Sequence, residues 1–326
     1  MKNRTQDLLC AAVFALVFSS AGAQAQSYPA KPIRVIVPYV AGGAADITAR
    51  TVSQKLGESL GVSLVVDNRP GANGGIGTDL VAKAAPDGYT LLLDASGPVV
   101  INPVLYAKVP YDPVRDLAPI SQTTSFMYVM IVPSSSPIAS FRELVAQARA
   151  KPGQFSYGST GIGGGNHLAG ELLALMTGAT LTHVPYKGSA AALTDLLGGQ
   201  LSFTFDTVIT AAPLAKAGKV RAYAVTSLKR ASTLPEVPSL NELGLKGFEI
   251  TQWQGFFAPT GTDRSIIAKL HQEIVKALKL PDVIERLATQ GGNEIIGNTP
   301  EQFAKVIESD LAMYAKLIKD AGIKAE

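Results

Sequence analysis

The sequence has almost no cysteine and little histidine. Of its 326 residues one is cysteine, Cys10, and three are histidine. Cys10 lies in an N-terminal stretch that we expect to be removed, so the mature chain is predicted to have no disulfide, no thiol nucleophile and no thiolate metal site. His167, His183 and His271 form no His-x-x-x-His pair, which leaves a metal without its usual ligands. We expect neither a metal nor another cofactor.

Charge is also scarce. Charged residues make up 17% of the chain, apolar residues 47%, and the formal net charge is +3. This charge is too small and too scattered to indicate binding to nucleic acid or to an anionic membrane surface. The apolar content provides ample material for burial, and the length exceeds what one hydrophobic core usually serves, so we predict two domains.

Long hydrophobic runs are missing as well. The apolar stretch from Leu8 to about Phe18 is too short to span a bilayer. It follows Lys2 and precedes Ala23-Gln24-Ala25, a pattern typical of a signal peptide over residues 1–25. We therefore expect an exported, periplasmic protein cleaved near Ala25. Residues 117–141 carry no formal charge, but polar residues and proline interrupt them, so we expect no membrane span there.

What is present is an alternation of short β-branched runs with helical patterns, which predicts an α/β fold with parallel sheets. The expected strands are Ile33–Val37, Leu64–Asn68, Thr90–Asp94, Val129–Val132, Phe155–Gly158, Thr182–Val184, Ser202–Phe205 and Arg221–Thr226. In the first expected helix Ala49, Val52, Leu56 and Leu60 share one face, and in the second Leu168, Leu172, Leu175 and Met176 do so, with Gly178 as a C-terminal stop. A third helix is expected from Ser189, its N-cap, to Gly198, and two more around Arg264–Lys279 and Pro300–Ala321. Pro213 leaves the start of a further helix open.

Polar or glycine-rich turns follow five of these strands, after Val37, Asp94, Gly158, Val184 and Phe205. In open α/β sheets ligands bind at the carboxyl ends of strands, beside the N-termini of the following helices. Two of the turns, VAGGAAD (40–46) and STGIGGGNH (159–167), are rich in glycine and contain no Lys or Arg. We interpret these two turns as the opposite walls of one cleft.

The glycine turns suit a small carboxylate. Helix N-termini attract anions through unpaired backbone N–H groups, and glycines such as Gly43 and Gly164 let the anion come close. A phosphate more often recruits Lys or Arg as well. Asn166 stands where a dinucleotide fingerprint needs its third glycine, and no Gly-Lys-Ser/Thr follows, so we do not expect a nucleotide. The alternative is that the glycines only permit tight strand-to-helix turns, but two turns in matching positions favour binding.

Single side chains leave alternatives open. Asp46 either braces its loop and caps the following helix or contacts the ligand. Asp206 ends an apolar strand, where it either accepts a hydrogen bond from a ligand hydroxyl or amine or braces the loop. His167 donates to a carboxylate or caps the turn. Ser159 with His167 offers a nucleophile and a base, but the spacing departs from Gly-x-Ser-x-Gly, so we expect no enzyme and no catalytic residue.

The residues then match a known pattern in order along the mature chain. The matching segments are YPAKPIRVIVPYVAGGAAD, VVDNRPGANGGIGT, PDGYTLLL, INPVLY, FSYGSTGIGGGNHLAGEL, VPYKGSAAALTDLLGGQ, FTFDT, GKVRAYAVTS and WQGFFAPTGT. With them the chain resembles the Bug-type extracytoplasmic solute receptors, the substrate-binding components of tripartite tricarboxylate transporters.

The resemblance implies a type II periplasmic-binding-protein fold, with two α/β domains joined by two crossing strands. Applied to this sequence, the crossing strands fall at Ser125–Pro133 and Ile250–Ala258. Domain 1 is then expected at residues 27–126 and 249–326, and domain 2 at residues 127–248.

The resemblance also implies a receptor that delivers a small carboxylate to membrane transporter subunits, and we expect a monomer. The implied ligand contacts are Tyr39, Ala41, Gly42, Asp46, Ser96, Ser159, Thr160, Gly161, His167 and Asp206, to which the helix N-termini add Gly43 and Gly164. The first turn, AGGAAD, lacks the Ser or Thr that relatives often place after the glycines, and GGGNH is more glycine-rich than usual.

The sequence leaves open di- or tricarboxylates, amino acids and aromatic acids as ligands. Tyr39, Phe205 and Trp253 either line an aromatic pocket or belong to the core. Two other functions stay open: a secreted hydrolase using Ser159 and His167, and a receptor that signals to a membrane sensor.

Overall fold

The computed structural model describes residues 28–325, so the predicted signal peptide and its cleavage site lie outside the described residues. The strands are β1 (Ile33–Val37), β2 (Leu64–Asn68), β3 (Thr90–Ala95), β4 (Leu117–Pro133), β5 (Phe155–Ser159), β6 (Leu181–Pro185), β7 (Phe203–Thr207), β8 (Val220–Val225), β9 (Thr251–Pro259) and β10 (Glu294–Ile295).

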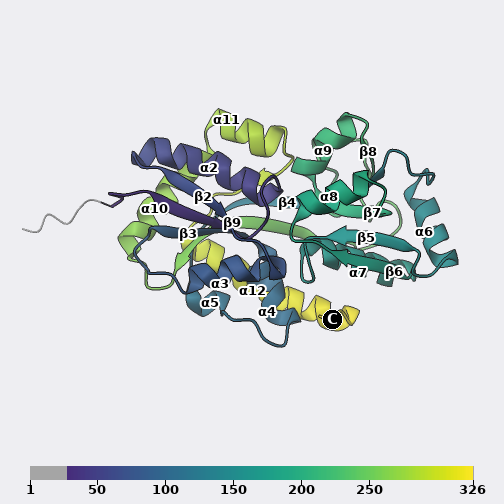
Figure 1. Cartoon of the computed structure of the whole chain (residues 1–326), viewed down its shortest axis with the longest axis horizontal. Helices are drawn as coiled ribbons and strands as arrows, with labels where there is room; N and C mark the ends of the chain where they lie inside the picture. Colours follow the sequence, from purple (N-terminus) through teal and green to yellow (C-terminus); the bar gives the residue numbers. More distant parts are fainter. Residues whose placement is uncertain (1–27, 326) are drawn as a thin grey trace, which may run out of the picture. The chain divides into compact units, whose positions relative to one another are not determined.

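Helices alternate with these strands along most of the chain (Figure 1). They are α2 (Ala44–Leu60), α3 (Gly75–Ala82), α4 (Asn102–Leu105), α5 (Pro113–Asp116), α6 (Phe141–Ala150), α7 (Gly165–Thr177), α8 (Ser189–Leu197), α9 (Val208–Lys216), α10 (Arg264–Leu278), α11 (Pro281–Ile284) and α12 (Pro300–Ala321). Among the described residues, none of these helices combines the length and the apolar character needed to cross a membrane.

The strands form one hydrogen-bonded sheet in the order β2-β1-β3-β9-β4-β7-β5-β6, with β8 and β10 also pairing with β4. The outer parts are parallel, as predicted: β1 pairs with β2 and β3, and β5 pairs with β6 and β7. The centre is antiparallel, because β9 pairs antiparallel with both β3 and β4, and β4 with β7. The parallel pairing predicted from the alternation of strands and helices is thus confirmed in the outer parts, and the two strands that join them, β4 and β9, pair antiparallel with each other and with their neighbours.

The long strand β4 explains the uncharged segment. It runs for 17 residues and begins at Leu117, eight residues before the predicted crossing strand. No residue of β4 is exposed, and the side chains on both of its faces are mostly buried, so charged residues are disfavoured there. Figure 1 shows β4 and β9 running between the strands of residues 33–95 and those of residues 155–225.

Several element boundaries follow local chemistry. α12 spans Pro300–Ala321 as predicted and starts with a capping box made by Thr299 and Gln302. Gly178 ends α7 in a left-handed conformation, also as predicted. Ser189 was the wrong N-cap of α8, since Gly188 takes that position and Ser189 is the first helical residue. α9 contains Pro213 in its interior.

The apolar faces of the helices supply the core. Ala49, Val52 and Leu56 of α2 are buried, as their spacing predicted. In α7, Leu168 and Leu172 are buried, but Leu175 is 56% exposed, so the predicted apolar face was one residue too wide. α2 packs on β2 and α10, while α12 packs on β4.

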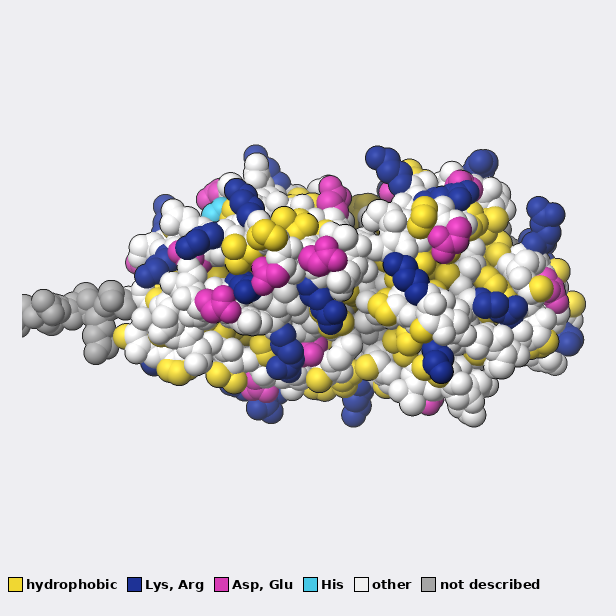
Figure 2. All heavy atoms as spheres, turned by 90° about the horizontal axis from the view of Figure 1, so that it is seen from above, with side chains coloured by type: hydrophobic (Ala, Val, Ile, Leu, Met, Phe, Trp, Pro, Cys, Tyr) yellow, Lys and Arg dark blue, Asp and Glu magenta, His cyan; other side chains and the backbone are white. Residues whose placement is uncertain are grey.

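The surface mixes charges of both signs. On the face in Figure 2, Lys and Arg alternate with Asp and Glu across the molecule without forming a stripe of one sign. This face therefore has no extended positive or negative field.

Candidate functional site

A cavity of about 50 Å³ lies where the strand ends meet the two central strands. This volume holds a few water molecules or part of a small ligand. Four of the five predicted turns contribute to its wall: the lining includes Tyr39, Val40 and Gly43 after β1, Ala95 and Gly97 at and after the end of β3, Thr160, Gly164 and Asn166 after β5, and Asp206 and Thr207 at the end of β7. The turn after Val184 does not line the cavity, but Ser189, the first residue of the helix that follows it, does. The topology thus brings the predicted turns together.

Three helix N-termini reach this cavity. Gly43 precedes α2, Gly164 precedes α7 and Gly188 precedes α8, and the first residues of each helix line the wall. No Lys, Arg or His side chain is among the cavity-lining residues of the described chain. The positive ends of the helix dipoles therefore face the cavity, and this arrangement suits an anion that is held without a basic side chain.

The glycines of the second turn serve close packing as well as ligand access. A Cβ on Gly163, whose φ is +84°, would lie 2.5 Å from the amide oxygen of Asn102. A Cβ on Gly161 would lie 3.3 Å from the Cβ atom of Asn73. The turn after β5 is thus pressed against residues 73–102 of the other part of the sheet, and only glycine leaves room for this approach.

Gly165 has the same role at the cavity wall. A Cβ there would lie 2.5 Å from the side-chain Cδ of Gln252 and 2.7 Å from the hydroxyl of Tyr128. Both neighbours line the cavity. The N–H of Gly164, by contrast, already donates to the carbonyl of Gly161 at 3.0 Å, so this donor is used within the turn.

Asp206 is the one carboxylate in the cavity wall of the described chain. Its side chain is 1% exposed, and Oδ2 accepts a 2.6 Å hydrogen bond from the hydroxyl of Thr210. Oδ1 has no hydrogen-bond partner among the described residues. Burial raises the pKa of Asp206 to about 6, against the lowering effect of hydrogen bonds from Thr210 and Thr207. One oxygen is braced and the other is left for a partner in the cavity.

The central strands supply lining residues that the sequence reasoning missed. Phe126 and Tyr128 of β4 and Gln252 and Gln254 of β9 alternate along their strands toward the cavity. Gln254 is 1% exposed and its Oε1 has no partner among the described residues. Two glutamines two positions apart in the otherwise apolar run of β9 were a usable signal, because buried amides need hydrogen-bond partners.

Gln252 is held firmly. Its Oε1 accepts a hydrogen bond from Ser96, and its Nε2 lies 2.6 Å from the hydroxyl of Tyr314 on α12. Ser96, a predicted contact, thus stands behind the wall and supports a lining residue instead of lining the cavity itself.

The structure separates the predicted contacts into two groups. Five of the predicted contacts line the cavity: Tyr39, Gly43, Thr160, Gly164 and Asp206. The other seven do not: Ser96, Ala41, Gly42, Asp46, Ser159, Gly161 and His167.

Asp46 braces its own turn. Its carboxylate accepts from the Gly42 N–H at 3.0 Å, from Arg50 at 3.0 Å and from the side chain of Asn68 at 3.0 Å. Burial raises the pKa of Asp46, and these hydrogen bonds outweigh it, so the pKa is lowered overall. The surroundings of Asp46 thus lower its pKa, whereas those of Asp206 raise the pKa of that residue.

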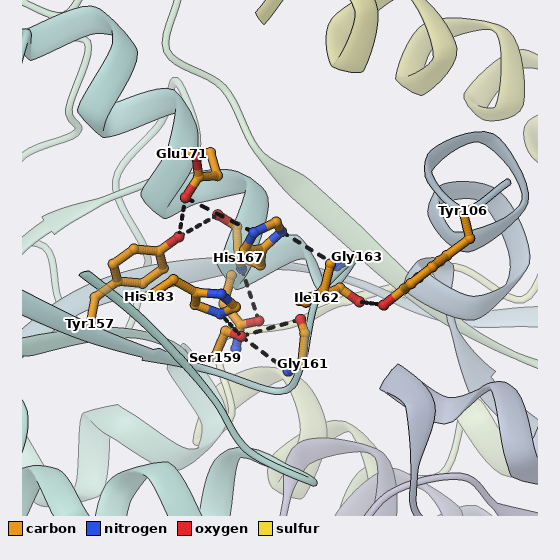
Figure 3. Close-up of polar contacts among 10 residues, drawn as sticks. Tyr106, Tyr157, Ser159, Gly161, Ile162, Gly163, His167, Glu171 and His183 are labelled. Atoms are coloured by element: carbon orange, nitrogen blue, oxygen red, sulfur yellow. Dashed lines mark hydrogen bonds and ion pairs between the residues drawn. The ribbon is translucent and has the colours of Figure 1, made fainter. Parts of the chain in front are cut away.

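Ser159 belongs to a polar cluster behind the glycine turn (Figure 3). Its hydroxyl lies 2.6 Å from Nε2 of His183 and 3.2 Å from the carbonyl of Gly161. The hydrolase hypothesis paired Ser159 with His167, but His167 accepts at Nδ1 from the Gly163 N–H at 3.3 Å and lies 4.0 Å from Glu171. Ser159 is fully buried, and its hydroxyl is bonded within this cluster.

The two histidines of this cluster stay neutral at ordinary pH. Their ring centroids are 4.4 Å apart. Burial lowers the pKa of His167 to about 4, and burial together with His167 lowers the pKa of His183 to about 4. Within residues 28–325 no group of three or more His, Cys, Asp or Glu side chains is arranged to hold a metal ion.

Comparison with protein families and curated proteins gives consistent matches. A family model described as the tripartite tricarboxylate transporter family receptor matches residues 48–323. The UPF0065 protein of the tcbD-tcbE intergenic region in Pseudomonas sp. (strain P51) is 41% identical over 98% of this chain and 95% of its own length. Protein BugT of Bordetella pertussis is 37% identical over 96% of this chain and 97% of its own.

Solved structures agree. The periplasmic binding protein BugD superposes with a TM-score of 0.88 at 36% identity, covering 92% of this chain and all of that one (100%). R. palustris Rpa4515 with adipate gives 0.88 at 34% identity, with 91% and 99% covered. MatC from Rhodopseudomonas palustris with bound malate gives 0.85 at 29% identity, with 89% and 100% covered.

Proposed function

The chain belongs to the tripartite tricarboxylate transporter family of receptors, and from this premise we propose that its cavity captures a small organic carboxylate and presents it to membrane transporter subunits. The observation that carries the proposal is the meeting of three helix N-termini at a cavity without a cationic side chain. Similar structures contain adipate and malate, which supports carboxylates as the ligand class.

A thermal-shift panel tests this proposal. The panel holds succinate, glutarate, adipate, malate, citrate, glutamate and benzoate, with a sugar and an alkylamine as controls. A ligand at one hundred times its dissociation constant stabilises the folded state by about 2.7 kcal/mol, which is readily detected. We expect at least one carboxylate to raise the melting temperature and both controls to leave it unchanged. A panel without any shift would contradict the proposal.

The proposed arrangement has two lobes that close on the ligand. We propose residues 27–126 with 249–326 as one and residues 127–248 as the other, with β4 and β9 passing between them. The strand order supports this division, because all parallel pairs join strands within one lobe. We also propose that the receptor is a monomer, exported to the periplasm after cleavage near Ala25. Light scattering and N-terminal sequencing of periplasmic material test these two points.

We propose binding without turnover. The buried hydroxyl of Ser159 is bonded within its own turn, which supports a structural role. Ligand recovered after long incubation should be chemically unchanged in mass spectrometry. A product that disappears with Ser159→Ala would favour a hydrolase instead.

A further inference from the structure

One carboxylate oxygen of Asp206 has no hydrogen-bond partner among the described residues, and this limits which ligand groups can lie beside it. Asp206 is the next-to-last residue of β7, which lies between β4 and β5 in the sheet. Thr210 on the next helix occupies Oδ2, and Oδ1 has no partner among the described residues although the side chain is 1% exposed. A buried carboxylate oxygen without a partner is costly. The ligand or a proton must satisfy it.

Within residues 28–325, no cationic side chain offsets this carboxylate. The titratable groups of the elements packed on β7 are Tyr128 of β4, Tyr157 of β5, His167 and Glu171 of α7, Asp195 of α8 and Lys216 of α9. Tyr128 lines the cavity and is neutral, since burial, then Tyr314 and then Asp206 raise its pKa well above 10.

The other groups are engaged elsewhere or exposed. The Tyr157 hydroxyl donates to Glu171 at 2.6 Å, and His167 faces His183 within the cluster of Figure 3. Asp195 accepts from the hydroxyl of Tyr186 at 2.7 Å, and Lys216 is exposed in the last turn of α9. Gln252 and Gln254, which approach the cavity from β9, carry no charge.

A carboxylate ligand would therefore meet an ionised Asp206 with no cation between them. Two carboxylates that share a water-poor site cannot both stay ionised, so one proton is taken up. Resting on the function proposed above, we propose that Asp206 binds the ligand as a carboxylic acid, taking a proton from solvent at Oδ1 and donating it in a hydrogen bond to a ligand carboxylate. Capture of a dicarboxylate is then coupled to uptake of one proton.

The free protein is already close to this state. Burial raises the pKa of Asp206 to about 6 in the free protein, and the negative charge of a bound carboxylate raises it further, so that the side chain is protonated in the complex at neutral pH. Below pH 6 the free receptor is protonated and affinity is independent of pH until the ligand itself becomes protonated. Above pH 6 the affinity for a dicarboxylate falls, by roughly fifty-fold between pH 6 and pH 8 for uptake of one proton.

Isothermal titration of the full mature chain with glutarate measures the coupling directly. At pH 7.5 the titration is run in phosphate and in Tris, whose ionisation enthalpies differ, and the difference gives the number of protons exchanged. We expect uptake of nearly one proton by the wild type. This measurement needs no variant, so a folding defect cannot obscure it.

The variant Asp206→Asn sharpens the test, because an amide donates a hydrogen bond without a proton from solvent. We expect it to exchange no proton with glutarate, to lose the pH dependence between pH 6 and 8, and to bind at pH 8 at least tenfold more tightly than the wild type. The matched control is Asp310→Asn, which alters a partly buried carboxyl whose pKa burial also raises. Asp310 bonds Trp253 at 2.7 Å outside the cavity, so this control should retain proton uptake.

Glutamate tests the opposite assignment, in which Asp206 binds the ligand as an anion. It has the carbon chain and both carboxylates of glutarate and adds an ammonium group, which an ionised Asp206 would bind. Tighter binding of glutamate than of glutarate, with a loss of tenfold or more in Asp206→Asn, would overturn the proposal. Glutarate binding without proton uptake would also overturn it and leave the receptor function intact. Absence of binding by every carboxylate of the panel would instead overturn the receptor function itself.

Discussion

Asp206 and Asp46 show how far the surroundings of one residue type decide its role. Asp206 is the next-to-last residue of β7, Asp46 lies in the first turn of α2, and both are buried. Asp46 accepts hydrogen bonds from Gly42, Arg50 and Asn68, whereas Asp206 keeps one oxygen without a partner. The surroundings of Asp46 therefore favour its anion, and those of Asp206 favour its neutral acid relative to an exposed carboxyl.

We predict opposite effects of neutralising these two residues. The folded pKa of Asp206, about 6, lies above the ordinary value of 3.8, so its favourable contribution to stability is complete below about pH 4 and is lost as pH rises through 6. Asp206→Asn should therefore stabilise the free protein at pH 8 by ~1–3 kcal/mol, with the gain shrinking toward pH 4. Chemical unfolding at pH 4, 6 and 8 measures this.

Asp46→Asn is the matched comparison. The folded pKa of Asp46 is lowered, so its contribution is present above pH 4 and is lost as pH falls below that value. This variant should destabilise the protein at pH 8. A destabilised Asp206→Asn at pH 8 would show that the hydrogen bond with Thr210 outweighs the burial of the charge.

At the scale of the element, the turn into α7 decides the shape of the site. Gly161, Gly163 and Gly165 place this turn against Asn73, Asn102 and the side chain of Gln252, with contacts that leave no room for a Cβ. The run of glycines thus has two functions. It exposes the N-terminus of α7 to the cavity, and it lets two parts of the sheet approach each other.

We predict that Gly165→Ala lowers ligand affinity by about tenfold or more while the protein stays folded. The added Cβ would lie 2.5 Å from Cδ of Gln252, so Gln252 must move into the cavity, and such overpacking costs about 1–3 kcal/mol. Titration calorimetry with the tightest carboxylate of the panel, together with circular dichroism, measures both effects.

Gly198→Ala is the matched control at the end of α8, where the new Cβ would lie 3.4 Å from its nearest neighbour, the carbonyl of Thr194. It should bind as the wild type does. Unchanged affinity in Gly165→Ala would show that Gln252 yields without narrowing the cavity.

At the scale of the whole molecule, contacts link the two proposed lobes across the cavity. The hydroxyl of Tyr106 donates to the carbonyl of Ile162 at 2.9 Å (Figure 3). Thr160 lies 3.4 Å from the side-chain oxygen of Asn73. These contacts hold the glycine turn against the other lobe, and we expect them to break when the lobes open.

We predict that Tyr106→Phe releases ligand about two- to tenfold faster. The hydroxyl contributes one neutral hydrogen bond of about 0.5–1.5 kcal/mol, which only the closed arrangement makes. Stopped-flow dissociation measures the rate. Tyr111→Phe is the control, because the Tyr111 hydroxyl donates to the Pro98 carbonyl at 2.8 Å within one lobe. Equal dissociation rates in both variants and the wild type would show that Tyr106 does not hold the lobes together.

The sequence alone predicted most regular elements and the strand ends that form the site. Its local signals were strong because helix periodicity, glycine C-caps and Pro300 act over a few residues. They also identified Tyr39, Gly43, Thr160, Gly164 and Asp206, all of which line the cavity, through their positions at strand ends. The family resemblance, confirmed by the match over residues 48–323, required only the order of motifs along the chain.

Tertiary structure alone decided which of these residues meet. The antiparallel pairing of β4 with β9 joins residues more than one hundred positions apart, and it brings Gln252 and Gln254 to the cavity. No local pattern separates Asp206 from Asp46, because the difference lies in partners that the fold supplies: Asn68 and Arg50 around Asp46, but Thr210 and an open oxygen at Asp206. Hydrogen bonding and burial depend on three-dimensional neighbours, and they determine the charge that a ligand encounters.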